Sequence, residues 1–245
     1  MFGWFKKKAP LPPEVLEADA LEAVVREGFG GDDLEGAYAA LTALAQEHPE
    51  FPDIRRLLAN AAVNLVRRRI EGRIEKDRAV VAQITQLAAD YPDEGVIRKC
   101  LVHLIWEYAA RVQRDDTDQL RELYHQQLGL YRAHTEVRTQ PSPIMKTAVK
   151  LMTGHLVNGN IPTARELHVE IVSFAQRHPD DREVQWDRAG ASLNLISRLV
   201  TVDDMSPKEY ELGRTYLEEL EDFASGYPQL ESVQEMVEQA RGYFE

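Results

Sequence analysis

The sequence predicts an all-α protein built from about five helical hairpins that follow one another along the chain. Three observations support this prediction: a short segment ending in proline recurs, apolar residues recur at helical spacing on both sides of it, and helix-starting residues stand at the expected boundaries. No segment shows the strict alternation of apolar and polar residues that is typical of a half-buried strand. A row of hairpins needs no single central core, because each hairpin can bury its apolar face against its neighbours.

The recurring segment, here named the proline phrase, occurs in four clear copies. It reads LAQEHP at residues 44–49, LAADYP at 87–92, FAQRHP at 174–179 and FASGYP at 223–228. The prolines lie 43, 87 and 49 residues apart, and since 87 is about twice 43, a fifth and degenerate copy is expected near residue 135. Leu130 and His134 stand there without a proline. Each copy should end a helix, because proline lacks the N–H of the next helical hydrogen bond and disfavours helical geometry at the residue before it.

A helix is expected on each side of every proline phrase. Apolar residues recur at helical spacing over residues 34–45, before the first copy, and over residues 54–66, after it. The helix after the second copy repeats the same stripe over residues 97–108. Each stripe covers one side of its helix and therefore needs a neighbouring helix to bury against.

Residues that favour helix starts stand at the expected boundaries. Asp33 is a candidate N-cap, and Ser142 and Ser206 each precede a proline, so each is expected to cap a helix that has this proline in its first turn. Pro162 opens a further helix. Residues 135–142 have the weakest pattern and predict a longer connection.

The chain is predicted to have two parts. Residues 1–13 form an aromatic and basic tip followed by a proline-rich spacer, and residues 14–245 form a single helical-repeat domain. Within that domain, residues 14–27 predict an extra N-terminal helix that is apolar on one side and acidic on the other. This helix would cap the open end of the row of hairpins.

Composition narrows the classes of function. With 44% hydrophobic and 29% charged residues the chain has the composition of a globular protein, and its formal net charge of −12 argues against a broad nucleic-acid surface. No apolar run is long enough to span a membrane, and the N-terminus lacks the apolar stretch of a secretory signal. The single cysteine, Cys100, falls on a predicted buried face and suits a reducing compartment. A cytoplasmic, bacterial-type location is therefore expected.

Part of the chain resembles a tetratricopeptide repeat. Residues 158–165 (NGNIPTAR) through 175–180 (AQRHPD) are similar to the turn, second helix and terminal proline of that repeat, and residues 36–38 with Pro49 are similar too. The period of 43 to 49 differs from the usual 34, and the tryptophan-leucine-glycine start is absent, which implies longer helices or loops. The resemblance implies a right-handed α-solenoid that binds protein or peptide. It also implies that the helix after each proline lines the concave surface.

Residues at one offset from each proline should occupy equivalent places, and they define a polar row on the helices after the prolines. All of its members are expected on the side of the helix that faces away from the apolar stripe. They are Arg56, Asn60, Asn64, Arg67, Lys99, His103, Glu107, Lys146, Lys150 and Asn194. Trp186 has the same offset as Arg56 and Lys99. Because amides and cations dominate this row in an acidic protein, it predicts binding of an acidic peptide or a terminal carboxylate. The alternative is a solvated helix face that binds nothing.

A basic cluster lies around one predicted turn. It consists of Arg67, Arg68, Arg69, Arg73, Lys76 and Arg78. Cations near a helix C-terminus interact favourably with its free carbonyls, and this is one explanation of the cluster. A phosphate-bearing or acidic partner is the other.

The N-terminal tip combines aromatic residues with lysines. Its members are Phe2, Trp4, Phe5, Lys6, Lys7 and Lys8. Such a tip suits weak contact with an anionic membrane, where rings enter the headgroup region and lysines meet lipid phosphates. Docking into a partner protein and packing against the chain's own first helix are the two alternatives. Membrane contact would place the protein peripherally at the inner membrane.

The histidines do not predict a catalytic or metal site. His48, His134 and His178 share their offset with two tyrosines, which predicts ring packing at helix ends. His103 belongs to the polar row, and His125, His155 and His168 lack the close pairing with carboxylates that a zinc site shows. No catalytic motif, metal site or cofactor is expected. The predicted function is a non-catalytic scaffold or adaptor that binds a protein, and the alternative is a structural subunit of a larger assembly or homo-oligomer.

Overall fold

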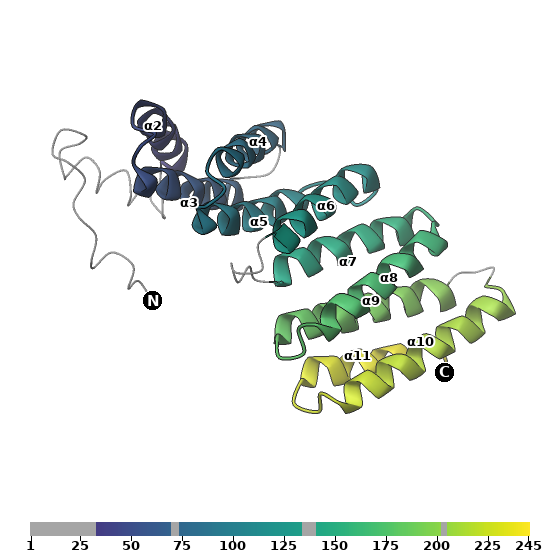
Figure 1. The fold of residues 1–245 in the computed structure, drawn as a ribbon. Coiled ribbons are helices and arrows are strands. Elements are labelled where there is room, and N and C mark those ends of the chain that lie inside the picture. Colours follow the sequence, from purple (N-terminus) through teal and green to yellow (C-terminus); the bar gives the residue numbers. More distant parts are fainter. Residues whose placement is uncertain (1–32, 70–73, 134–140, 202–204) are drawn as a thin grey trace. The chain divides into compact units, whose positions relative to one another are not determined.

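The computed structural model describes residues 33–69, 74–133, 141–201 and 205–245, and within these ranges the chain is all-helical, without strands (Figure 1). The described helices are α2 (Leu34–Glu47), α3 (Pro52–Arg68), α4 (Ile74–Asp90), α5 (Gly95–Ala109), α6 (Thr117–Ala133), α7 (Ser142–Val157), α8 (Ile161–Gln176), α9 (Arg182–Val200), α10 (Pro207–Ser225) and α11 (Glu231–Arg241). The all-α prediction is confirmed for this part of the chain.

The proline phrases lie where helices end. The four copies coincide with the ends of α2, α4, α8 and α10, and α3, α5, α9 and α11 begin a few residues after the respective prolines. Helices α6 and α7 flank the position near residue 135 where a degenerate copy was expected. Counted along the chain, the ten described helices make five successive pairs, and the two helices pack against each other in α2–α3, α6–α7, α8–α9 and α10–α11. Residues 134–140, which connect α6 to α7, lie outside the described residues, as do the expected helix over 14–27 and the tip over 1–13.

Side-chain caps explain several helix starts. Asp33 Oδ1 accepts the Gly36 N–H at 2.8 Å, as predicted. Ser206 and Glu209 form a reciprocal capping box, in which the Ser206 hydroxyl accepts the Glu209 N–H at 3.2 Å and the Glu209 carboxylate accepts the Ser206 N–H at 2.8 Å. The prediction for Ser142 was wrong, because α7 starts one residue earlier than expected and the Ser142 hydroxyl instead donates to Glu183 at 2.6 Å.

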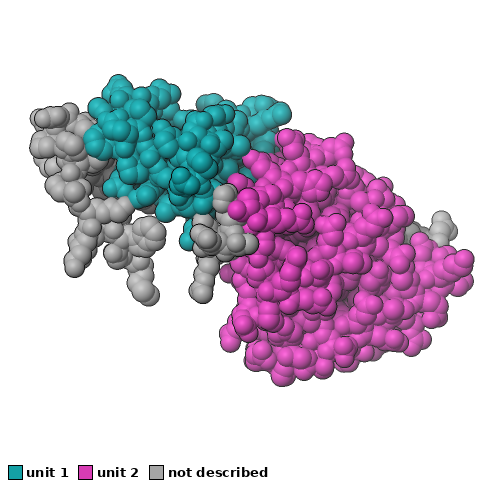
Figure 2. All heavy atoms as spheres, viewed as in Figure 1, with its two compact units in different colours: residues 1–108 teal, residues 109–245 magenta. Residues whose placement is uncertain are grey.

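The chain divides into two compact units, Met1–Tyr108 and Ala109–Glu245, which Figure 2 shows in separate colours. In the first unit α3 packs against α2 and α4. Its core is aliphatic and includes Leu41, Ile54, Leu58, Ala62 and Ile84. A buried ion pair joins two helix ends in this unit, since Arg69 Nη1 lies 2.6 Å from Oδ1 of the fully buried Asp77.

In the second unit α7 and α9 pack against more helices than the other helices do. Helix α7 packs against α6, α8 and α9, and α9 packs against α8, α10 and α11. Long side chains connect α6 to α8, because the Tyr124 hydroxyl donates to Glu170 Oε2 at 3.2 Å. Gly154 of α7 allows a close approach: a Cβ at this position would lie 2.1 Å from the backbone oxygen of Arg114. The core of this unit includes Leu120, Ile144, Met145, Leu151, Met152, Leu195 and Ile196.

Two further observations bear on the sequence predictions. Cys100 is buried, as expected, and burial raises the pKa of its thiol to about 12. None of the helices in the described ranges combines the length and the apolar composition that are needed to cross a lipid bilayer.

Candidate interaction surface

The polar row lies on four helices, α3, α5, α7 and α9, and no member of it is buried. Arg67, Lys99 and Asn194 are exposed, and the other members are half-buried. Trp186, which shares the offset of Arg56 and Lys99, is 46% exposed, although large apolar side chains are normally covered. The offset rule therefore selected positions that solvent and partners can reach.

In the first unit the arginines of the polar row are paired with carboxylates. Arg56 Nε lies 3.2 Å from Glu94 Oε2, and its Nη1 lies 3.1 Å from Asp53 Oδ1. Arg67 Nε donates to Glu107 Oε1 at 2.7 Å, so two members of the polar row bind each other. The Asn60 amide donates to the Arg56 backbone oxygen at 2.8 Å. The pairs made by Arg56 and Arg67 join α3 to α5 and to the turn before α5. Because these arginines already bind carboxylates of the protein, they are less available to an acidic ligand.

In the second unit the polar row joins α7 to α9. Lys146 Nζ donates to Glu183 Oε2 at 3.0 Å, and the Ser142 hydroxyl donates to the same oxygen. These two hydrogen bonds lower the pKa of Glu183. Further along the helices, the Asn194 amide lies 3.5 Å from the Thr153 hydroxyl, which is at the limit of hydrogen bonding.

Lys150 has a different environment from the other cations of the polar row. Its Nζ donates to the backbone oxygens of Ala109 and Ala110 at 2.7 and 2.6 Å, where a helix end leaves carbonyls without partners. Within the described ranges no ion pair with a carboxylate is recorded for Lys150. Burial, together with the nearby positive charge of Arg114, lowers the pKa of Lys150 to about 8. An anion at this position would restore the ordinary pKa.

Asp187, one residue after Trp186, is a functional candidate that the sequence analysis missed. Its side chain is on α9, the residue is 5% exposed, and its Oδ2 has no hydrogen-bond partner. Burial raises the pKa of this carboxyl to about 7, while the positive charge of Lys146 opposes the shift and Glu183 adds to it. A signal was present in the sequence, because Val184 and Ala191 place Asp187 on the apolar side of the helix.

The structure also reveals, at three of the four phrases, a residue six positions after the proline that donates to backbone oxygens of the turn. Gln185 Nε2 donates to the backbone oxygens of Ala175 and His178 at 3.0 and 2.8 Å. Gln234 Nε2 does the same for Ala224 and Tyr227, at 3.0 and 3.4 Å. Arg55, at the same offset from Pro49, donates to the Pro49 oxygen. The oxygens bound by Gln185 and Gln234 also accept backbone N–H groups of the turn, so these two side chains add a second hydrogen bond that ties the following helix to the turn. The offset itself was the available signal.

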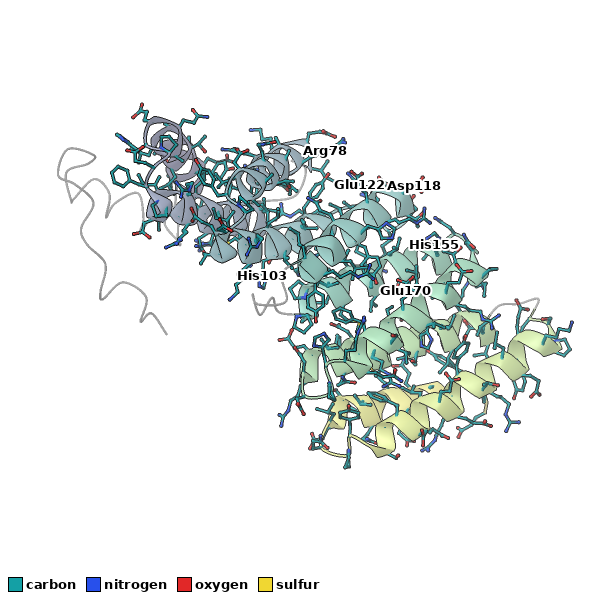
Figure 3. The ribbon with its side chains drawn as sticks, viewed as in Figure 1. Arg78, His103, Asp118, Glu122, His155 and Glu170 are labelled. Carbon is teal, nitrogen blue, oxygen red and sulfur yellow. The ribbon has the colours of Figure 1, made fainter. Side chains whose placement is uncertain are left out.

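Two members of the basic cluster, Arg67 and Arg69, form ion pairs within the first unit. Arg69 pairs with Asp77 and also with Glu35, whose Oε1 lies 2.9 Å from Arg69 Nε. Three other members are exposed, namely Arg68, Lys76 and Arg78, and Figure 3 shows Arg78 on α4. Arg73 lies outside the described residues. The cluster thus supplies ion pairs between helices in addition to exposed cations.

Rings before the prolines pack at helix ends, as predicted. The His178 ring lies 4.8 Å from that of Phe174, and its Nε2 lies 2.7 Å from the Tyr131 hydroxyl. The Tyr91 and Tyr227 hydroxyls donate to the backbone oxygen of the preceding phrase proline, at 3.3 and 3.4 Å. The His134 position lies outside the described residues. These rings connect successive phrases.

Other histidines also have structural partners. His168 is buried, its Nε2 lies 2.8 Å from the Ser192 hydroxyl, and burial lowers its pKa to about 4. His155 of α7 accepts a hydrogen bond from Arg121 of α6 at 3.1 Å, and Arg121 also pairs with Asp118; His155 and Asp118 are labelled in Figure 3. Among the described residues, no three His, Cys, Asp or Glu side chains come together as a metal site would require.

The tip residues Phe2, Trp4, Phe5, Lys6, Lys7 and Lys8 lie outside the described residues, so their three alternatives stay predictions. Comparison of the chain with family models, with curated proteins and with solved structures gave no match. The fold and the candidate surface are therefore argued from the residues of this chain.

Proposed function

We propose that the protein is a non-catalytic scaffold that binds a protein or peptide partner along the polar row. One observation carries this proposal: residues chosen by a single offset rule are unburied, and two of the helices that carry them, α7 and α9, pack against each other. A binding surface assembled from equivalent positions of successive hairpins is the usual arrangement in helical-repeat proteins. The exposed Trp186 adds a residue type that is enriched at energetically important points of interfaces.

The proposal includes a tetratricopeptide-like, right-handed α-solenoid. Helix packing in the second unit supports it, because α7, α9 and α11 form a continuous series in which each packs against the next. Helices α6, α8 and α10 pack instead against members of this series. In a curved stack the helices that approach each other most closely lie on the concave side, and this supports a concave position for the members of the polar row on α7 and α9.

The proposed partner is acidic where it meets α7. Lys150 is held by backbone oxygens, and Arg114 adds a second positive charge nearby, so an approaching carboxylate would gain a charge-assisted hydrogen bond. The first unit contributes less, because Arg56 and Arg67 are already paired. We place the protein in the cytoplasm, with the N-terminal tip as a further contact to an anionic membrane or to the partner.

Affinity capture with two matched variants tests the proposal. The first variant replaces Asn64, Lys146, Lys150 and Asn194 by alanine. The control replaces Glu122, Glu166, Ser173 and Gln176, which are exposed on α6 and α8. We expect the first variant to lose a partner that the wild type and the control retain from the native lysate, with helicity checked by circular dichroism. Equal capture by all three proteins would refute the use of the polar row.

Light scattering separates the scaffold from a structural subunit. A scaffold is expected to be a discrete species that gains mass only when its partner is added. An obligate homo-oligomer whose size is insensitive to the four substitutions in the polar row would favour the structural alternative.

A further inference from the structure

One face of α9 carries a stripe of three residues that differ from the rest of the polar row. Trp186, Gly190 and Asn194 are spaced by four, so they lie on the same side of the helix. The Trp186 ring is 46% exposed, and Asn194 is exposed too. Between them, a Cβ built at Gly190 would meet no atom within 4 Å. The stripe thus has an aromatic ring at one end, an amide at the other, and between them a glycine with free space above it.

Packing does not explain Gly190. Glycine in a helix interior weakens the helix, and it is usually retained where a backbone or a side chain of another element approaches closely. At Gly213, for comparison, a Cβ would lie 2.6 Å from Val200 Cγ1, so packing does explain that glycine. The space above Gly190 is free of protein atoms and has room for an incoming side chain.

Charges on the two neighbouring helices differ in sign. Helix α7, on one side of α9, carries Lys150, whose partners are backbone oxygens, and Lys146, which pairs with Glu183 of α9. Helix α11, on the other side, presents Glu231 and Glu235, which are exposed and spaced by four. Glu235 has the same offset from its proline as Trp186. A ligand that crosses α9 therefore meets positive charge at one end and negative charge at the other.

We propose that this stripe is a subsite for an extended peptide segment with charges of opposite sign on either side of a ring. An acidic residue lies toward Lys150, an aromatic or proline ring stacks on Trp186 above Gly190, and a basic residue lies toward Glu235. This inference rests on the proposed scaffold function and specifies the chemistry of its ligand.

Each residue of the stripe has a distinct task. The indole face of Trp186 offers a flat apolar surface on which a ring packs with offset or edge geometry. Gly190 leaves room for that ring at the helix surface. The Asn194 amide has both donors and acceptors, so it can bind an N–H and a C=O of the same extended peptide. The charges at the two ends fix the direction of the peptide across the helix.

Selection from a displayed library of random dodecapeptides on the full-length protein tests this subsite. We expect enriched peptides to share the order acidic residue, ring, basic residue. Five variants are compared: Trp186→Ala, Trp186→Phe, Gly190→Leu, Lys150→Ala and, as a matched control, Gly129→Leu on α6, where a Cβ also meets open space. Trp186→Ala and Gly190→Leu should each weaken binding of the enriched peptides by about tenfold or more, whereas Gly129→Leu should leave it unchanged. Trp186→Phe should keep most of the affinity, because it keeps a ring.

The outcomes separate the subsite from the proposed function. Enriched peptides that require Lys150 but bind Trp186→Ala and Gly190→Leu as tightly as wild type would overturn the subsite and leave the scaffold proposal standing. Peptides that require the stripe but have the opposite or no charge order would overturn the assigned direction and ligand chemistry. No enrichment over a library panned without protein would count against both. Circular dichroism and thermal unfolding of each variant show whether lost binding reflects lost fold.

Discussion

The two units use their charges in different ways. In the first unit several cations on the helix ends pair with carboxylates: Arg67 binds Glu107, and Arg69 binds the buried Asp77. In the second unit Lys150 binds backbone oxygens, and Asp187 is buried without a partner for Oδ2. Equivalent positions of a repeating pattern can therefore stabilise the protein in one place and leave binding capacity in another. The amino-acid type at each offset decides which of the two applies.

Removing Asp77 should have the largest effect on the first unit. Asp77→Ala leaves the Arg69 guanidinium buried with one carboxylate fewer, and loss of one partner of a buried pair costs about 3 to 5 kcal/mol of unfolding free energy. Urea unfolding followed by circular dichroism measures the change. The exposed Glu75, in the same first turn of α4, provides the control, and Glu75→Ala should change stability by less than about 0.5 kcal/mol. Equal effects of the two variants would mean that the buried pair is not a main support of this unit.

Asp187 should make the second unit sensitive to pH in the opposite sense to an ordinary carboxylate. Its pKa is about 7 when folded and near 4 when unfolded, so between these pH values the folded state holds a proton that the unfolded state lacks. Stability therefore falls as pH rises from about 4 to 7, by up to about 3 to 4 kcal/mol from this group. Asp187→Asn should be more stable than wild type at pH 8 and equal to it near pH 4. Identical pH profiles of the two proteins in chemical unfolding would exclude this role.

Substitution of Gln185 tests how much the hydrogen bonds of its side chain to the preceding turn stabilise the second unit. Gln185→Leu leaves the Ala175 and His178 oxygens without this donor in a buried place, which should cost about 2 kcal/mol. Gln176→Leu, at an exposed position of the same turn region, is the control and should be close to neutral. Thermal unfolding of both variants gives the comparison. If Gln185→Leu matched its control, the turn would be held by the proline phrase alone.

Gly190 should show the smallest effect, and its sign is favourable. Alanine fits the helical backbone and meets open space, so Gly190→Ala should raise the free energy of unfolding by about 0.5 to 1 kcal/mol. The same change at Gly129 of α6 should raise it by a similar amount. A loss of stability for Gly190→Ala but not for Gly129→Ala would show that the space above Gly190 is occupied in solution.

Local features of the fold could be predicted from the sequence, because their causes lie within a few residues. Helix ends follow from the prolines, and the cap at Asp33 depends on a residue three positions away. Long-range partners could not be predicted in this way. Ser142 was predicted to be a cap from its neighbours in the sequence. Its hydroxyl binds Glu183, which is 41 residues away, and no local pattern indicates such a partner. Arg69 looked like a free cation for the same reason, since Glu35 approaches it from another helix.

The candidate surface was predicted in its positions and less well in its chemistry. The offset rule found residues that are not buried, yet it could not show that Arg56 and Arg67 meet carboxylates. Asp187 was missed because the rule selects exposed positions, whereas Asp187 lies on the apolar side of α9 next to Val184 and Ala191.

The side-chain bonds between successive hairpins have a consequence for how the chain unfolds. The bond from Arg67 to Glu107 spans 40 residues, and the one from Arg165 to Tyr216 spans 51, so each joins a helix pair to its immediate neighbour. The bonds from Gln185 to its turn span only 7 and 10 residues. When each hairpin is coupled only to its nearest neighbours, a defect in one hairpin lowers the stability of the next, and its effect on more distant hairpins is smaller. Hydrogen exchange should therefore show fraying that begins at α10 and α11 and moves inward, with no single transition shared by every amide.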